Sequence, residues 1–203
     1  MARTKKKNLL WREIESEKLS EYTALLTDLQ NAGCEFSAFV IDGRRGVREL
    51  ILSRFPLIPL QICQFHQVAI IRRYLTSRPK LVASQELLRI VRTLKKSTQE
   101  DFENALSNWH ERWKEFLNER TTDESRRGWH YTHKRLRSAY RSIATNLPWL
   151  FTCRQYPELK IPNTTNSCDG YFAHLKQRLG IHRGLRREQR KKMTNYFLES
   201  GLS

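Results

Sequence analysis

The stretch Phe36-Ser-Ala-Phe-Val-Ile-Asp-Gly43 decides the fold class, together with Leu60-Gln-Ile-Cys-Gln-Phe65 further along the chain. Each is a short apolar run, and the first ends at the turn residues Asp42-Gly43, which is typical of a buried strand. Apolar residues at helical spacing lie before the first run, over 17–31, and between the two runs, over 47–55. With a further short strand at Leu9-Leu10-Trp11, this order predicts an α/β sheet of about three strands.

The pattern changes after His66. Residues 67–146 carry apolar residues at three- and four-residue spacing and almost no strand signal, so we predict an all-helical insertion with a polar loop over 121–128. Later helices are predicted over 167–179 and 186–198. Four Trp residues are interpreted as helix-packing residues rather than as platforms for base stacking: Trp109, Trp113, Trp129 and Trp149.

The composition points to a polyanionic partner. The 203 residues carry a formal net charge of +16 at a pI near 10.1, which favours nucleic acid first and an anionic membrane surface second. A basic but merely solvated surface is the alternative. No apolar run approaches the roughly 20 residues of a membrane-spanning helix. The four Cys residues show no CxxC pair, which favours a reducing compartment over a disulfide scaffold.

Asp42 and Asp169 are candidate metal ligands. Asp42 follows an apolar strand, and ligands of open α/β sheets bind beyond the carboxyl ends of the strands. Asp169 lies in the first turn of the helix predicted over 167–179, and Lys176 follows two turns later on the same face. Each carboxylate also has a structural alternative. Asp42 could be an Asx-type turn residue that caps the next helix, and Asp169 could complement the helix dipole.

Cys63-Gln-Phe-His66 offers two metal ligands. A closed zinc site needs four, and the other candidates, the pair His130 and His133 or the pair Cys153 and Cys168, stand in no finger-like spacing. The alternative is a buried Cys beside a partnered His at a strand-to-helix junction.

The C-terminal part is basic. Residues 170–203 contain eight Lys or Arg residues against Glu188 and Glu199, an excess of six positive charges. Such a run can neutralise several phosphates with salt-sensitive affinity. A solvated helix face is the alternative.

Several motifs, in this order, resemble the transposases of bacterial insertion sequences related to the Mutator superfamily. The resemblance covers residues 8–198. It rests on Val40-Ile-Asp-Gly-Arg-Arg-Gly46, Phe55-Pro56, Gln61-Ile-Cys-Gln-Phe-His66, Tyr131-Thr-His-Lys-Arg-Leu-Arg-Ser-Ala-Tyr140, Asn146-Leu-Pro-Trp-Leu-Phe151, Asn163-Thr-Thr-Asn-Ser-Cys-Asp169, Phe172-x-x-Leu-Lys176 and His182-Arg-Gly-Leu185.

The resemblance implies a ribonuclease-H-like core with three acidic (DDE) residues, interrupted by an all-α insertion. It implies that 8–66 is the first part of the core, 67–146 the insertion, and 147–203 the second part of the core with a basic tail. Asp42 matches the second acidic residue. Asp169 matches the third, where the family usually has Glu, and Cys63 and His66 match its C/DxxH motif. The DNA-binding residues implied are Lys176, Arg178, His182, Arg183, Arg186 and Arg187.

The activity implied is strand cleavage and transfer in double-stranded DNA, at element ends and target, with two Mg²⁺ ions held by Asp42 and Asp169. Carboxylate ligands suit hard divalent ions. The resemblance also implies a homo-oligomer when active, located in the cytoplasm at the bacterial nucleoid.

The resemblance leaves the family's first acidic residue without a match. We expect the first two strands of the core to be missing, from truncation or a split gene, with an upstream chain as a possible partner that supplies them. Asp28 is the nearest upstream Asp, but it falls within the helix predicted over 17–31. The alternative function is a non-catalytic DNA-binding remnant of a transposase.

Overall fold

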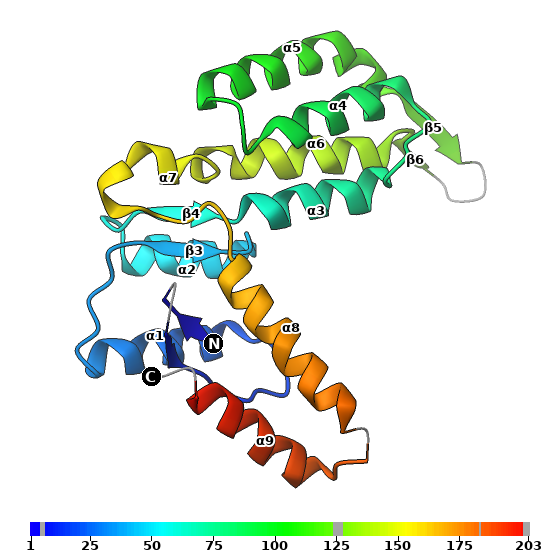
Figure 1. Ribbon diagram of the computed structural model, residues 1–203. Coiled ribbons are helices and arrows are strands. Elements are labelled where there is room, and N and C mark those ends of the chain that lie inside the picture. The colour runs from blue at the N-terminus through cyan, green and yellow to red at the C-terminus, as the bar shows by residue number, and fades with distance from the viewer. Residues whose placement is uncertain (5–6, 124–127, 183, 201–203) are drawn as a thin grey trace. The chain divides into compact units, whose positions relative to one another are not determined.

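The fold is described from a computed structural model, over residues 1–4, 7–123, 128–182 and 184–200. It is mixed α/β and mostly helical (Figure 1). The helices are α1 (Leu19–Asn31), α2 (Arg45–Arg54), α3 (Gln64–Leu75), α4 (Val82–Thr93), α5 (Gln99–Asn118), α6 (Lys134–Asn146), α7 (Thr152–Gln155), α8 (Asn166–Ile181) and α9 (Arg187–Glu199), with 3-10 turns η2 (Leu147–Trp149) and η3 (Pro157–Leu159).

Within the described residues, the strands form three two-stranded sheets. These pair β1 (Ala2–Arg3) with β2 (Asn8–Leu10), β3 (Phe39–Ile41) with β4 (Leu60–Ile62), and β5 (Arg120–Asp123) with β6 (Gly128–Tyr131). The predicted mixture of helices and strands is confirmed at this level, but the predicted sheet of about three strands is wrong for the described residues, because β2 pairs with β1 while β3 pairs with β4. The ribonuclease-H-like core and its division at residues 66 and 146 stay predictions.

The chain divides into two compact units, which we describe separately. The first contains Met1–Phe39, Arg44–Ile58 and Thr165–Ser203, and the second contains Val40–Gly43 and Pro59–Thr164.

Aromatic and cationic side chains join the helices of the first unit. The ring centroids of Phe36 and Phe39 each lie within 5.2 Å of that of Phe55, beside α2. The Arg54 guanidinium binds back to α1 through Thr27 Oγ1 at 2.8 Å. At the other end of the sequence, the Tyr171 hydroxyl of α8 donates to the Phe197 carbonyl of α9 at 2.6 Å.

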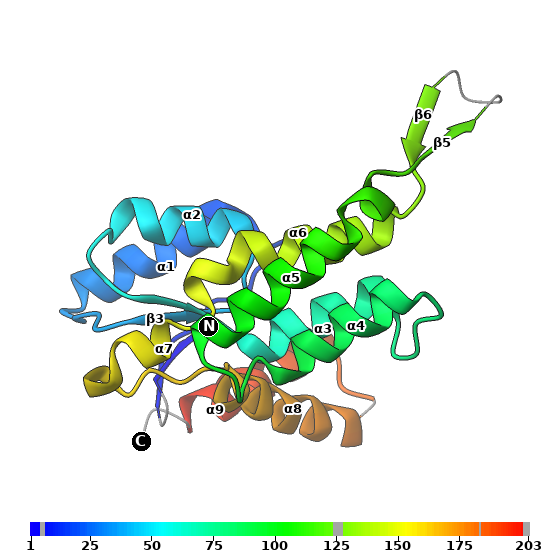
Figure 2. The same ribbon diagram turned by 90° about the horizontal axis from the view of Figure 1, so that it is seen from above.

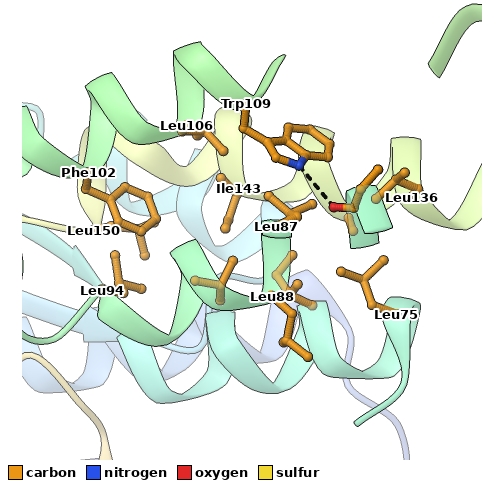
Figure 3. Packing of buried hydrophobic residues seen from close by; sticks show 14 of the residues in the cluster. Leu75, Leu87, Leu88, Leu94, Phe102, Leu106, Trp109, Leu136, Ile143 and Leu150 are labelled. Carbon is orange, nitrogen blue, oxygen red and sulfur yellow. Dashed lines mark hydrogen bonds between the residues drawn. The ribbon is translucent and has the colours of Figure 1, made fainter. Parts of the chain in front are cut away.

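The second unit is built around the core shared by α3, α4, α5 and α6 (Figure 3). Phe102, Leu87 and Ile143 are fully buried there, as helical spacing of their apolar residues predicts. Trp109 belongs to the same core, and its indole Nε1 donates to the Ala83 carbonyl at 3.0 Å. The start of α5 is fixed by Thr98, whose hydroxyl accepts from the Asp101 N–H at 3.1 Å, a typical N-cap.

Two expectations for the insertion are wrong. In the segment predicted as a polar loop over 121–128, residues 121–123 and 128 are strand residues, because Arg120 to Asp123 pair with Tyr131 to Gly128 in antiparallel register. Residues 124–127 lie outside the described residues. Polar and β-branched residues can form a strand where neither face is fully buried. Trp129 is not a packing residue: it lies on this hairpin and is 51% exposed.

A third expectation fails at the strand predicted over 60–65. It ends at Ile62, and α3 begins at Gln64. The reason lies in the backbone, where the Gln67 N–H donates to the Cys63 carbonyl at 3.0 Å and closes the first helical turn. The Cys63-to-His66 motif therefore stands on a helix start.

Candidate functional site

Asp42 follows the last residue of β3, and its side chain is exposed. The backbone on either side of it is held against β4. The Ile41 carbonyl accepts from the Cys63 N–H at 2.7 Å. Gly43 has a φ of +88°, and a Cβ there would lie 3.1 Å from Cγ2 of Ile62. A side chain at this position would therefore be strained in conformation and tight in space.

The N-cap residue of α2 is Arg44, whose own side chain makes no capping hydrogen bond. The Asx-turn alternative for Asp42 stays a prediction. Asp42 is thus an exposed carboxylate at the end of a strand, which is the position predicted from the sequence for a metal ligand.

Cys63 and His66 are brought together by the start of α3. The Cys63 side chain is fully buried, and its Sγ lies 3.2 Å from Nδ1 of His66. Across the residues that the structure describes, no group of three or more His, Cys, Asp or Glu side chains could hold a metal ion. The contact agrees with the buried Cys and partnered His alternative, not with a closed zinc site.

A buried network of amides surrounds this motif. The Gln61 and Gln64 side chains both donate to the Leu150 carbonyl, at 2.9 and 2.8 Å. Gln61 also accepts from the Cys153 N–H at 2.8 Å. Gln64 is joined to Asn163 twice, through its backbone N–H to the Asn163 carbonyl at 2.9 Å and through the Asn163 amide to its Oε1 at 3.1 Å. The motif at Gln61–His66 and the motif that begins at Asn163, about a hundred residues later, thus meet in one unit. Their amides satisfy one another, because buried polar groups require hydrogen-bond partners.

The network continues to residue 146. Asn146 donates through Nδ2 to Gln67 Oε1 at 2.8 Å, and the same Nδ2 lies 3.6 Å from the Cβ position of Gly43. In the sequence, Asn146 carries no signal beyond its place in a family motif, since it is a single amide at the end of a helix.

Asp169 lies in the first turn of α8, as predicted. Its carboxylate is exposed, and its Oδ2 accepts from the Thr165 hydroxyl at 3.0 Å. Lys176 stands two turns further along α8 and is also exposed. Asp169 belongs to the first unit and Asp42 to the second. Each is described within its own unit, so their meeting at one metal site stays a prediction.

The cations implied by resemblance are exposed wherever the structure describes them. Lys176, His182 and Arg187 are exposed in or after α8 and at the start of α9, and so is Arg186, the N-cap of α9. Arg178 is exposed too, with its guanidinium carbon 5.3 Å from the centroid of the Phe197 ring. Arg183 lies outside the described residues. These residues stay predictions as DNA ligands.

The chain is strongly basic, has an α/β fold and carries an exposed carboxylate at a strand end. These features are those expected of a protein that acts on nucleic acid. The family model described as "Transposase, Mutator family" matches residues 5–145, and the chain therefore belongs to the Mutator family of transposases. The match includes Asp42, Cys63 and His66 and ends before Asp169 and Lys176. No curated protein and no solved structure matches the chain. None of the helices in the described ranges is both long and apolar enough to cross a membrane.

Proposed function

We propose that this chain supplies part of the catalytic site of a DNA transposase that cleaves DNA and joins it to a new site. In this proposal, Asp42 and Asp169 are two carboxylate ligands of divalent metal ions, as second and third acidic residues of a DDE set on a ribonuclease-H-like core. The position of Asp42 carries the proposal, because its exposed carboxylate follows β3 inside the region that matches the Mutator family.

Both carboxylates suit Mg²⁺, since this ion prefers oxygen ligands and keeps several waters. Two bound metal ions supply stabilisation of the attacking and leaving oxygens. The protein would hold those ions through Asp42 and Asp169, while Lys176 and the neighbouring cations hold DNA phosphates. The described residues contain no three-ligand group. In this proposal an upstream chain supplies the first acidic residue of the set.

The second candidate function is DNA binding without catalysis. The net charge of +16 and the exposed cations of α8 and α9 support DNA binding by either candidate. Only the metal dependence separates the two.

Manganese binding tests the metal site without requiring an active assembly. We expect the wild-type chain to bind Mn²⁺, measured from the electron paramagnetic resonance signal of the free ion, and Asp42→Asn to bind it at least about tenfold more weakly, because a carboxylate ligand is lost. Glu49→Gln is the matched control. Its carboxylate is exposed on α2 and pairs with Arg45 at 2.7 Å, so this variant should bind Mn²⁺ like wild type.

Plasmid nicking completes the test. Mg²⁺-dependent nicking that is lost in Asp42→Asn and kept in Glu49→Gln supports the transposase function. A wild-type chain that binds DNA but binds Mn²⁺ no better than Asp42→Asn contradicts it and favours the non-catalytic alternative.

A further inference from the structure

The β5–β6 hairpin presents cationic and aromatic side chains on one face. Its register pairs Arg120 with Tyr131 and Thr122 with Trp129. Residues opposite each other in an antiparallel pair, and residues two apart in a strand, point to the same side. Arg120, Trp129 and Tyr131 therefore share one face.

These side chains form a cluster with Arg137 of α6, in which the Trp129 and Tyr131 rings meet edge to face with centroids 5.2 Å apart. The Arg137 guanidinium carbon lies 3.6 Å from the Tyr131 ring centroid, and that of Arg120 lies 5.8 Å from the same centroid. Arg120 is in turn 3.8 Å from the ring centroid of Trp129. We call this order, Arg137–Tyr131–Arg120–Trp129, the stacking ladder. Guanidinium groups and aromatic faces attract each other in this geometry.

The inner end of the ladder is fixed to the helices. Arg137 Nη1 donates to the Leu117 carbonyl and to Asn118 Oδ1, both at 2.8 Å. At the base of the hairpin, the Thr132 N–H donates to the Glu119 carbonyl at 2.9 Å, and His133 stacks on Phe116 with ring centroids 3.7 Å apart.

The outer end of the ladder is open. The hairpin extends away from the ends of α5 and α6 (Figure 2), and Trp129 is 51% exposed. A ladder that served folding alone would gain most by burying its largest ring. Here the ring nearest the outer end of the hairpin is the one left in solvent.

A cationic groove lies beside the base of the hairpin. It has a volume of about 570 Å³ and is lined by Arg78 and Lys80, which follow α3, and by Lys134 and Arg135 at the start of α6. Thr132 and His133 line it too, so it adjoins the hairpin directly. Four cations around one groove suit the phosphates of a nucleic-acid backbone.

We propose that the hairpin binds single-stranded DNA, with one unpaired base stacked on Trp129 and the adjoining phosphates in the cationic groove. The inference rests on the proposed function for the choice of DNA as partner. It favours single strands because a paired base inside a duplex has its faces covered by neighbours, whereas an unpaired base offers a face to an aromatic ring.

Binding of a labelled single-stranded oligo(dT) and of a blunt duplex of equal length, followed by fluorescence anisotropy, tests this site. We expect Trp129→Ala to weaken oligo(dT) binding about fivefold to a hundredfold, the range for one stacked base, and to change duplex binding little. Trp129→Phe keeps an aromatic face and should retain most of the affinity. Tyr156→Ala is the control, since Tyr156 is a 40% exposed aromatic residue of the same unit outside the hairpin.

The role of the cationic groove is tested by the salt dependence of oligo(dT) binding. Lys134→Gln should reduce the slope of log affinity against log salt by about one. The inference is overturned if wild type binds oligo(dT) and Trp129→Ala binds it equally well, or if Trp129→Phe loses as much as Trp129→Ala. Neither result affects Mn²⁺ binding through Asp42, so failure of this site is distinguishable from failure of the proposed function. A wild-type chain that binds no DNA overturns both.

Discussion

The backbone N–H of Cys63 donates to the carbonyl of Ile41 at 2.7 Å, so the first residue of the CxxH motif is bonded to the residue before Asp42. On the other side of Asp42, Gly43 closely approaches Ile62. The backbone around Asp42 therefore lies beside the end of β4, with one hydrogen bond before Asp42 and one close approach after it. In the proposed function, this arrangement lets the CxxH motif position the Asp42 carboxylate.

Replacing Gly43 tests whether the backbone after Asp42 leaves room for a side chain. Gly43→Ala places a Cβ 3.1 Å from Cγ2 of Ile62 at a φ of +88°. We expect it to lower the free energy of unfolding by about 1–3 kcal/mol, because both conformation and space are unfavourable. Urea denaturation measures the change.

The control for Gly43→Ala is Gly170→Ala in α8, where a Cβ would meet no atom within 4 Å. Alanine in a helix is better than glycine by about 0.5–1 kcal/mol, so this variant should be slightly more stable than wild type. A Gly43→Ala protein as stable as Gly170→Ala would show that the turn after Asp42 tolerates a side chain.

We expect the buried glutamine side chains of the amide network to contribute more to the free energy of unfolding than exposed glutamine side chains do. Gln61→Leu removes the acceptor of the Cys153 N–H from a side chain that is fully buried. Leaving a fully buried donor without its partner costs about 1–3 kcal/mol. Because this N–H is partly buried, we expect a loss of about 1 kcal/mol, which equilibrium unfolding in urea would detect. Gln177→Leu, at an exposed position of α8, should change stability by less than about 0.5 kcal/mol. Equal effects of the two substitutions would contradict the role assigned to the network.

A shared metal site requires the carboxylates of Asp42 and Asp169 to come within about 10 Å of each other, since two metal ions in such sites are about 4 Å apart. We expect Asp42→Cys and Asp169→Cys, combined in a chain with Cys34, Cys153 and Cys168 replaced by Ser, to be joined intramolecularly by a short bismaleimide. Mass spectrometry of the digested protein identifies the product. Chains with either single Cys replacement provide the background, and a double variant that yields no more product than they do contradicts the shared site.

The thiol of Cys153 should react slowly at mildly alkaline pH. Burial is the main cause that raises its pKa, and it outweighs the opposing charge of Arg154. Because the folded pKa lies above the unfolded one, the stabilisation linked to this thiol is complete below the unfolded value, about 8.5, and is lost as pH rises through the folded value. The midpoint of alkylation against pH, followed on the Cys153 peptide by mass spectrometry, should lie higher in native protein than in concentrated urea. Coinciding midpoints would refute this.

Much of the fold follows from local pattern. The helical spacing of Leu26 and Leu29 marks α1, Gly33 follows its end with a φ of +76°, and the apolar residues around Phe102 mark α5. These signals are local, because helix periodicity and turn residues act within a few positions. The helix that begins at Gln64 could not be separated from the strand before it, because apolar residues continue through both.

The hairpin and the amide network carried weaker signals. Trp129 and Tyr131 alternate with polar neighbours, which is a strand pattern, but only four residues long. The partners of Gln61 and Gln64 lie 89 and 86 residues away, and nothing near either glutamine in the sequence indicates them. The placement of Asp42 after a strand was predictable, whereas the contacts that fix its backbone depend on the pairing of β3 and β4.

The distance in sequence between these amides and their acceptor affects the order in which contacts form during synthesis. A ribosome completes Gln61 and Gln64 well before it reaches Leu150, the residue whose carbonyl both side chains bind. During synthesis, the side chains of Gln61 and Gln64 therefore lack their hydrogen-bond acceptor until Leu150 is made. Contacts between residues so far apart in sequence form late in folding. A pause in translation between these positions would leave both amides hydrogen-bonded to water until Leu150 is made.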